Sequence, residues 1–351
     1  MENVSITSAL DFKTENLANE LRKLDKINGN EVKIDVTKMG RIRALPLMIY
    51  LSKVISMNKK GKRFIVGTPL HDTNPIGYAR NIGFFNALMN SKDDTLNFKM
   101  SKIKENFIPI MRVTYKTLYD SCKNGLDYHL GLEECSRKMA EIITNNGNLG
   151  IQEYVKSDLN SMLSYCIREM IRNTFEHNTD GTSLWVMAQK HKEERTIELV
   201  FLDDGQGIKQ NLSVNKQLAA KIRNDFVALK YALKSGISGN ARKSNNKDKW
   251  GNSGYGLYMT SELVRSLGAF CIYSKGAGGY ILGGNKLQQS KIQTNIDGTL
   301  IGLVIKIDKL NEKSSGFYNS YFDYVLRKGE ERAQNDEFAI KSASMASKLK
   351  Y

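Results

Sequence analysis

The sequence contains few cysteines and prolines and no long apolar run. Its 351 residues include four prolines and four cysteines, which are Cys122, Cys135, Cys166 and Cys271. Because the cysteines are widely spaced and form no Cys-x-x-Cys pair, neither a disulfide framework nor a zinc site is indicated. The longest apolar run, residues 45–51, is too short to cross a bilayer, and the first residues do not resemble a signal peptide. We therefore expect a cytoplasmic protein, without export or a membrane span.

Acidic residues are also in short supply. The chain has 52 Lys and Arg residues against 37 Asp and Glu residues, which gives a formal net charge of +15 at pH 7. Such a surplus attracts nucleic acid or an acidic surface when it is clustered. Here the lysines are spread along a chain that is also rich in Asn and Ile, and no nucleic-acid-binding motif is recognisable. The charge favours an ordinary solvated surface, and a nucleic-acid partner is left open without being indicated.

Length and periodicity predict two α/β units. With 41% hydrophobic residues, a chain of this length can bury a large core, and its length favours two domains. In residues 1–150 the patterns predict strands at 32–36 and 63–66, helices at 45–57 and 75–88, and an apolar stretch at 107–110 followed by helical sequence, with a boundary turn at 145–148. In residues 151–308 they predict helices at 158–177, 218–233 and 256–266 and strands at 183–188, 196–202, 270–274 and 300–307. Residues 309–351 are expected to form a helical extension or tail.

The helix predicted at 158–177 carries the first candidate site residues. Its apolar residues recur at three- and four-residue spacing, and Glu169, Asn173 and His177 form a row along one edge of the apolar face. An amide oxygen is a suitable ligand for Mg²⁺, and a carboxylate one turn earlier can orient an attacking water or hydroxyl. Taken alone, this spacing is common, and an ordinary exposed helix edge explains it more simply.

A carboxylate and two glycines follow the strand predicted at 196–202. Asp203 stands at the strand end and can accept a hydrogen bond from an adenine amino group. Gly205 and Gly207 would let the backbone approach the ring closely. A tight turn that joins two elements is the alternative interpretation.

Two further segments have the chemistry of a nucleotide site. Residues 251–257 are rich in glycine and open a helix, so that unpaired N–H groups and the helix dipole would suit triphosphate oxygens. No Gly-Lys-Ser/Thr follows, so this is not a Walker motif, and a flexible hinge is the alternative. Thr299 stands at the start of the last predicted strand, where its hydroxyl can bridge to an aspartate or a water.

In their order and context, these segments resemble the N box, G1 box, G2 box and terminal Thr of the GHKL ATPase and kinase superfamily. The matching stretches are EMIRNTFEHN, DDGQGI, GNSGYGLYM and DGTLIGLVIKI. The resemblance implies a Bergerat-type α/β sandwich over 151–308, a mixed sheet with helices on one face, which binds ATP and Mg²⁺. It implies that Asn173 holds Mg²⁺, that Asp203 binds the adenine amino group with support from Thr299, and that Gly254 and Gly256 face the phosphates. Gly205, Gly207, Ile208 and Leu257 complete the expected pocket, with His177 as a phosphate or lid contact. The lid would span about 209–250, where Arg242, Lys243, Lys247 and Lys249 could neutralise phosphate charge.

The residue at position 169 bears on the reaction. In this superfamily, sensor histidine kinases usually lack a glutamate there, whereas ATP-hydrolysing members and anti-sigma-factor-type serine kinases use it as the general base. Glu169 as the catalytic residue therefore implies ATP hydrolysis or phosphorylation of a protein Ser or Thr. None of the four histidines has the context of a sensor-kinase acceptor. The alternative is a nucleotide-gated protein-binding module with little or no turnover.

The N-terminal unit resembles, less closely, a STAS domain of the anti-sigma-factor antagonists. The segments VKIDVTKMGRIRALPLMIYLSKVI, KGKRFIVGTP and PIGYARNIGFFNAL follow its order of strand, helix, strand and helix. Ala44 and Leu45 stand where that family has a phosphorylatable Ser. The resemblance thus implies a regulatory surface for a protein partner and not a phosphate acceptor, with an unrelated α/β module as the alternative. A homodimer is left open.

Overall fold

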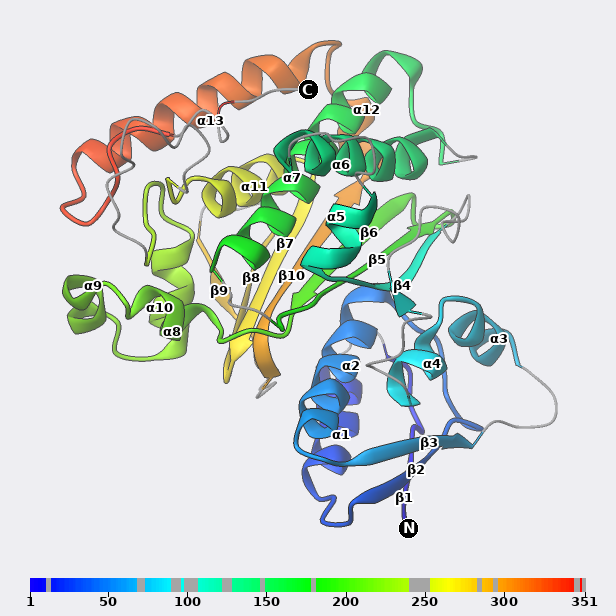
Figure 1. Cartoon of the computed structure of the whole chain (residues 1–351). Helices are drawn as coiled ribbons and strands as arrows, with labels where there is room; N and C mark the ends of the chain where they lie inside the picture. Colours follow the sequence, from blue (N-terminus) through cyan, green and yellow to red (C-terminus); the bar gives the residue numbers. More distant parts are fainter. Residues whose placement is uncertain are drawn as a thin grey trace.

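The computed structural model shows an α/β protein with two β-sheets (Figure 1). It describes residues 1–10, 14–67, 73–89, 96–97, 107–121, 128–145, 149–177, 181–239, 253–282, 286–292, 296–343 and 348. Within these residues, three strands form one sheet and seven strands form the other. The expected α/β class is confirmed.

The smaller sheet is built from strands and helices near the N-terminus. Strands β1 (Glu2–Ser5), β2 (Glu31–Asp35) and β3 (Arg63–Gly67) pair in parallel in the order β1-β2-β3. The helices are α1 (Thr14–Asp25), α2 (Ala44–Lys59), α3 (Asn74–Asn81) and α4 (Phe84–Met89). The single helix expected at 75–88 is divided in two, because Gly83 adopts a left-handed conformation (φ 80°) just after α3. Strand β1 was not predicted from the sequence.

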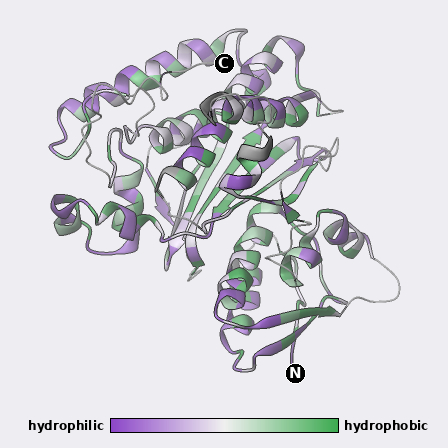
Figure 2. Cartoon of the chain, viewed as in Figure 1, coloured by the Kyte–Doolittle hydropathy of each residue, from purple (hydrophilic) through white to green (hydrophobic). Residues whose placement is uncertain are grey.

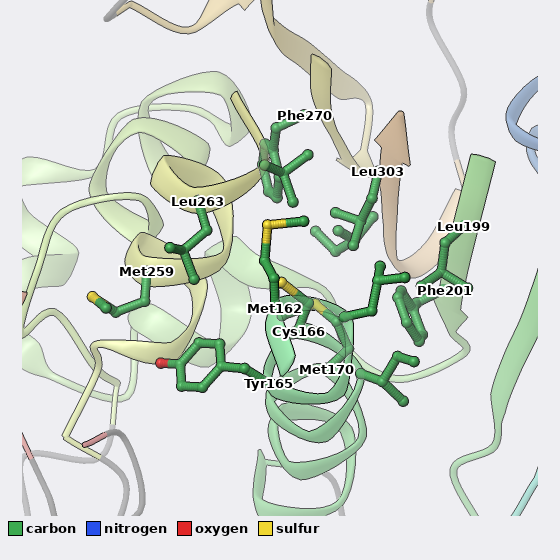
Figure 3. Close-up of a cluster of buried hydrophobic side chains, with 14 of the residues drawn as sticks. Met162, Tyr165, Cys166, Met170, Leu199, Phe201, Met259, Leu263, Phe270 and Leu303 are labelled. Atoms are coloured by element: carbon green, nitrogen blue, oxygen red, sulfur yellow. The ribbon is translucent and has the colours of Figure 1, made fainter. Parts of the chain in front are cut away.

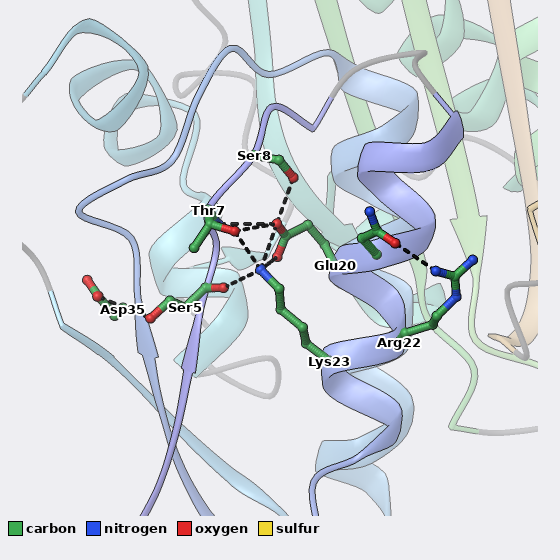
Figure 4. Close-up of polar contacts among 8 residues, drawn as sticks. Ser5, Thr7, Ser8, Glu20, Arg22, Lys23 and Asp35 are labelled. Carbon is green, nitrogen blue, oxygen red and sulfur yellow. Dashed lines mark hydrogen bonds and ion pairs between the residues drawn. The ribbon is translucent and has the colours of Figure 1, made fainter.

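A polar cluster fastens α1 to the segment that follows β1 (Figure 4). Glu20, which is 1% exposed, accepts hydrogen bonds from Ser8 Oγ at 2.6 Å and from Lys23 Nζ at 2.8 Å. Lys23 Nζ also donates to the carbonyl oxygen of Ser5 at 2.9 Å. Because a buried carboxylate is costly without charged and hydrogen-bonding partners, these contacts explain how Glu20 can be buried here.

The larger sheet is antiparallel throughout. Its order is β4-β5-β6-β10-β7-β8-β9, with β4 (Phe107–Val113), β5 (Leu184–His191), β6 (Thr196–Asp203), β7 (Gly268–Lys275), β8 (Ala277–Leu282), β9 (Gln288–Gln289) and β10 (Ile296–Lys306). The expectation of a mixed sheet is wrong for the described strands. The turns between β5 and β6 and between β7 and β8 are too short for a parallel crossover, and β10 lies antiparallel to both β6 and β7.

Helices cover one face of the larger sheet. Helices α7 (Glu153–His177) and α11 (Gly256–Arg265) pack beside each other there, and α6 (Tyr128–Asn145) and α13 (Phe317–Gln334) pack against α7. Figure 3 shows Met162, Cys166 and Met170 of α7 beside sheet residues such as Phe201 and Leu303. The remaining helices are α5 (Tyr115–Ser121), α8 (Ile208–Leu212), α9 (Lys216–Lys221), α10 (Asp225–Ala232) and α12 (Ile307–Asn311).

Helix α2 of the N-terminal unit covers the opposite face of the larger sheet. It packs against β6 and β10, where Val200, Leu202 and Leu300 join the α2 side chains in one buried cluster. The neighbouring residues of the same strands point toward α7, as the alternation of a strand requires. The described helices of residues 151–308 all join the core around α7, and the second face of the sheet is covered by a helix from outside that unit, which was not expected. The reason is that 13 of the 16 residues of α2 are buried, so the helix needs apolar partners on more than one side.

Residues on both sides of the expected boundary at 145–148 share the core around α7. Strand β4 pairs with β5, and α5 and α6 contribute Leu118, Leu132 and Met139 to the core around α7. Helix α13, which was expected as an extension or tail, buries Tyr318 and Phe322 in that same core. Figure 2 shows hydrophobic colour concentrated on the strands of the larger sheet and mixed colouring along α13. No helix in the described part of the chain is long and apolar enough to cross a membrane.

Candidate functional site

A cavity of about 120 Å³ lies between the larger sheet and helices α7, α8, α10 and α11. Seven of the residues expected from the sequence line it, namely Asn173, Asp203, Ile208, Gly254, Gly256, Leu257 and Thr299. Much of the remaining wall is apolar, including Met170, Leu184, Phe201 and Ile301. An apolar cavity with a few convergent polar groups is the usual form of a small-molecule site.

The carboxylate end of the cavity is formed by two neighbouring strands. Asp203 at the end of β6 pairs directly with Thr299 of β10 in the strand register. Asp203 Oδ1 accepts a hydrogen bond from the Gly205 N–H at 2.9 Å. Burial raises the pKa of Asp203 to about 6, and the neighbouring Asp204 acts in the same direction, while the bonds from Gly205 and Thr299 oppose the rise. The negative charge of Asp203 therefore costs free energy in the empty cavity, and a hydrogen-bond donor of a ligand would lower this cost.

A β-bulge holds this carboxylate end together. The pairing of β10 with β7 shifts register between Ile296 and Thr299, and Gly298 sits in the shift with φ 81°. The Gly298 carbonyl accepts from Ser274 Oγ at 3.0 Å, and Ser274 Oγ accepts from the Ile208 N–H at 2.9 Å. Gly207 leaves room for this connection, because a Cβ there would lie 2.9 Å from Ser274 Oγ.

The bulge glycine supports a first prediction. We expect Gly298→Ala to lower the free energy of unfolding by at least about 2 kcal/mol, since an added Cβ would meet a left-handed backbone and would also overlap the Asp203 carbonyl oxygen. Gly316→Ala is the matched control, because Gly316 has a similar φ of 75° but no heavy atom within 4 Å of the added Cβ. It should cost only about 1 kcal/mol. Urea denaturation of both variants checks this, and equal losses would contradict a special role for the bulge.

The glycine-rich end of the cavity is closed by backbone contacts. The Gly236 N–H donates to the Gly254 carbonyl at 3.1 Å, and Gly254 has φ 71° with the Ile237 backbone so close that a side chain would not fit. A Cβ at Gly256 would overlap Glu169 Oε2. The side chain of Tyr255, at the N-cap of α11, makes no capping bond, so the first turn of this ten-residue helix begins at the cavity wall without a side-chain cap.

The segment after α13 braces this glycine-rich end. The Ile340 N–H donates to the Gly236 carbonyl at 2.8 Å, and Tyr255 Oη donates to the Ile340 carbonyl at 3.2 Å. Lys234 and Asp336 form an ion pair at 2.9 Å beside them. The region expected to form a helical extension or tail therefore also supports the glycine-rich end of the cavity.

Glu169 lies behind the cavity wall and not in it. Its Oε1 contacts Arg168 Nη2 at 2.9 Å and Arg172 Nη1 at 3.0 Å, and all three side chains are nearly fully buried. Its Oε2 faces Gly256 at the start of α11. The two arginines hold the carboxylate in place, so it is fixed next to the cavity and does not line it.

The other expected residues fall outside the cavity or outside the described residues. Gly205 and Gly207 support Asp203 and Ile208 without lining the cavity. His177 is the last residue of α7, and the position of its side chain lies outside the described residues, as do Lys249, Arg242, Lys243 and Lys247. The described part of the expected lid, residues 209–239, includes α9 and α10, which bury Leu218 and Leu229 in the main core.

Three polar lining residues, Thr174, Asn211 and Ser238, were not identified as site residues by the sequence analysis. Ile208, Asn211 and Leu212 recur at the three- and four-residue spacing of one helix face, and this pattern could have identified Asn211. Ser238 follows α10 in a segment without regular periodicity, so nothing in its local sequence points to it.

The described residues offer few ligands for a metal ion. Within the described residues, no group of three or more His, Cys, Asp or Glu side chains is placed to hold a metal. Asn173 offers one amide group at the cavity wall. Since Mg²⁺ commonly keeps several waters and uses substrate phosphates, one amide in a nucleotide pocket is compatible with it.

The comparisons with known proteins give no relatives for this chain. No family model, no curated protein and no solved structure matches it. Any functional conclusion therefore rests on the residues and geometry of the cavity.

Proposed function

We propose that this chain is a GHKL-type signalling or regulatory protein that binds Mg-ATP in the cavity and either hydrolyses ATP or phosphorylates a protein Ser or Thr. The observation that carries the proposal is that Asn173, Asp203 and Gly254, from three elements far apart in sequence, line one cavity. A helix amide, a strand-end carboxylate and a glycine-rich helix start are complementary to magnesium, adenine and phosphate respectively.

In this proposal each end of the cavity has its own task. Asp203 accepts a hydrogen bond from the adenine amino group, and apolar residues such as Phe201 and Ile301 enclose the ring. The N–H groups around Gly254 and Gly256 bind phosphate oxygens at the start of α11. Asn173 would hold Mg²⁺, which neutralises phosphate charge when it is bound. Glu169 is the proposed general base, with Oε2 as the oxygen that faces this region.

A nucleotide-gated binding module is the second candidate function. It is favoured by the position of Glu169, whose Oε1 contacts two buried arginines and which does not line the cavity. In that case ATP would control a protein partner, which we place at the N-terminal unit by its resemblance to a STAS domain, without meaningful turnover. For both candidate functions we propose a cytoplasmic location.

Two assays on the wild-type protein test the proposal and separate the candidates. We expect calorimetry to detect binding of ATP in the presence of Mg²⁺, and single-turnover experiments with γ-labelled ATP to show either released phosphate or a labelled protein Ser or Thr. Binding without release or labelling, also when candidate partners from a pull-down are added, would favour the binding module. If calorimetry detects no binding of any adenine nucleotide, both candidate functions are wrong.

A further inference from the structure

The C-terminal end of helix α2 contacts the two chain segments that form the carboxylate end of the cavity, residues 203–205 and 297–299. Ser56 Oγ donates to Asp297 Oδ2 at 2.5 Å, and Lys59 Nζ donates to the Asp204 carbonyl at 2.8 Å. Lys59 Nζ also lies 3.2 Å from Asp204 Oδ2. Asp204 directly follows Asp203, and Asp297 is two residues before Thr299. One turn of an N-terminal helix thus contacts both strands whose ends carry the proposed adenine contacts.

Asp204 and Asp297 each make contacts through both of their carboxylate oxygens. Asp204 Oδ1 accepts from the Ser183 N–H at 2.7 Å, while Lys59 contacts its other oxygen. Asp297 Oδ1 lies 3.3 Å from Lys275 Nζ, while Ser56 binds its Oδ2. Burial opposes ionisation of Asp297, but the bonds from Ser56 and Lys275 hold its pKa below the usual range. Replacing Lys59 or Ser56 therefore removes the contacts that α2 makes to Asp204 or Asp297, and the contact to the other carboxylate oxygen stays in place.

The opposite end of α2 is fixed to the same sheet. Glu198, a fully buried residue of β6, accepts from the Ala44 N–H at 2.9 Å and from Arg43 Nε at 2.7 Å. At this same end, Gly302 of β10 lets Leu45 approach the sheet, because a Cβ there would lie 2.7 Å from Leu45 Cδ1. Since both ends of α2 are bonded to the sheet and the helix packs on β6 and β10, a displacement of α2 must be transmitted to these strands.

We propose that Ser56 and Lys59 are positioning residues for the nucleotide cavity, so that α2 couples the N-terminal unit to nucleotide affinity. This inference rests on the proposed function. The coupling acts through the end of β6 at 203–205 and the bulge of β10 at 297–299, which set the position of the Asp203 carboxylate and of Thr299. Because coupling is reciprocal, nucleotide binding also changes the affinity of the N-terminal unit for whatever binds it.

The test compares Ser56→Ala and Lys59→Met with two controls on the same helix. Ser52→Ala removes a buried hydroxyl that donates only within α2, to the Ile49 carbonyl at 2.7 Å. Lys53→Met removes an ammonium group that pairs with Asp25 of α1, away from the cavity. The dissociation constant of Mg-ATP is measured calorimetrically on each full-length variant, together with the melting temperature of the nucleotide-free protein. Lys59→Arg serves as the conservative variant.

We expect the dissociation constant to rise about fivefold or more in Ser56→Ala and in Lys59→Met, and to stay within about twofold of wild type in both controls and in Lys59→Arg. Lower melting temperatures with unchanged dissociation constants would overturn the inference, because Ser56 and Lys59 would then serve stability alone. Equal losses of affinity in the controls would overturn it too. If the wild-type protein binds no adenine nucleotide, the proposed function itself fails, which is a different result from equal binding by wild type and variants.

Discussion

Asp203→Asn is expected to abolish the stabilisation of the protein by ATP. In the wild type, nucleotide at one hundred times its dissociation constant should raise the free energy of unfolding by about 2.7 kcal/mol. The amide of Asn presents an N–H₂ group as well as an oxygen, and it lacks the charge that strengthens the bond from the adenine amino group. Thermal denaturation with and without Mg-ATP measures the difference. A variant that is stabilised as strongly as the wild type would show that Asp203 does not recognise the ligand.

The same substitution should stabilise the nucleotide-free protein at neutral pH. The pKa of Asp203 is raised from its ordinary 3.8 to about 6 by burial, so the folded state binds the proton more tightly than the unfolded state. The resulting stability is fully present below pH 3.8 and is lost as the pH rises through about 6. Asn has no charge to lose and can still accept from the Gly205 N–H. We therefore expect the variant to exceed the wild type by at most about 3 kcal/mol at pH 7.5 and to match it near pH 3.8.

Urea denaturation across this pH range provides the measurement. A pH-independent difference between Asp203→Asn and wild type would contradict the raised pKa. The thermal denaturation with and without Mg-ATP and the urea denaturation across pH together distinguish a ligand-binding carboxylate from a structural one. A ligand-binding carboxylate lowers the stability of the protein when the cavity is empty.

Glu169→Ala is expected to lower the free energy of unfolding by about 3–5 kcal/mol, because it removes the carboxylate that Arg168 and Arg172 both contact in the core. Glu169→Gln keeps an oxygen acceptor of the same size and should cost less. Glu262→Ala is the control, since Glu262 pairs with Arg265 at a more exposed place on α11 and should cost no more than about 1 kcal/mol. Urea denaturation checks all three.

This result decides how the catalytic role of Glu169 can be measured. If the Ala variant unfolds easily, lost turnover in it says nothing about chemistry, and Glu169→Gln is the informative variant. A Gln variant that binds ATP with unchanged affinity and releases no phosphate would support the general base. An Ala variant within about 1 kcal/mol of wild type would contradict the buried ion-pair cluster.

The candidate site was accessible to sequence analysis because its parts are local. Glu169, Asn173 and His177 follow helix spacing, and Asp203 and Gly254 stand where a strand ends and a helix begins. Such signals depend on neighbouring residues only. The fixed position of Glu169 between two arginines was not predicted, because its neighbours at one and three residues could equally have pointed into solvent.

The way in which helices and strands pack together was harder to predict from the sequence. The apolar sequence of α2 predicts a buried helix, yet it does not say that β6 and β10 lie against it. Likewise, the apolar stretch at β4 reads the same whether it joins the first sheet or the second. Strand direction, too, depends on which strands pair and not on their composition.

Residue types, spacing and glycine positions in the chain alone were therefore enough to locate seven of the residues that line the candidate cavity and most of the helices and strands. Packing in three dimensions was needed to place β4, α6 and α13 in the core of the larger sheet and α2 on its opposite face. The physical reason is that helix and strand periodicity shows which side of an element avoids water, while the partner that covers this side is chosen by contacts between segments far apart in the chain.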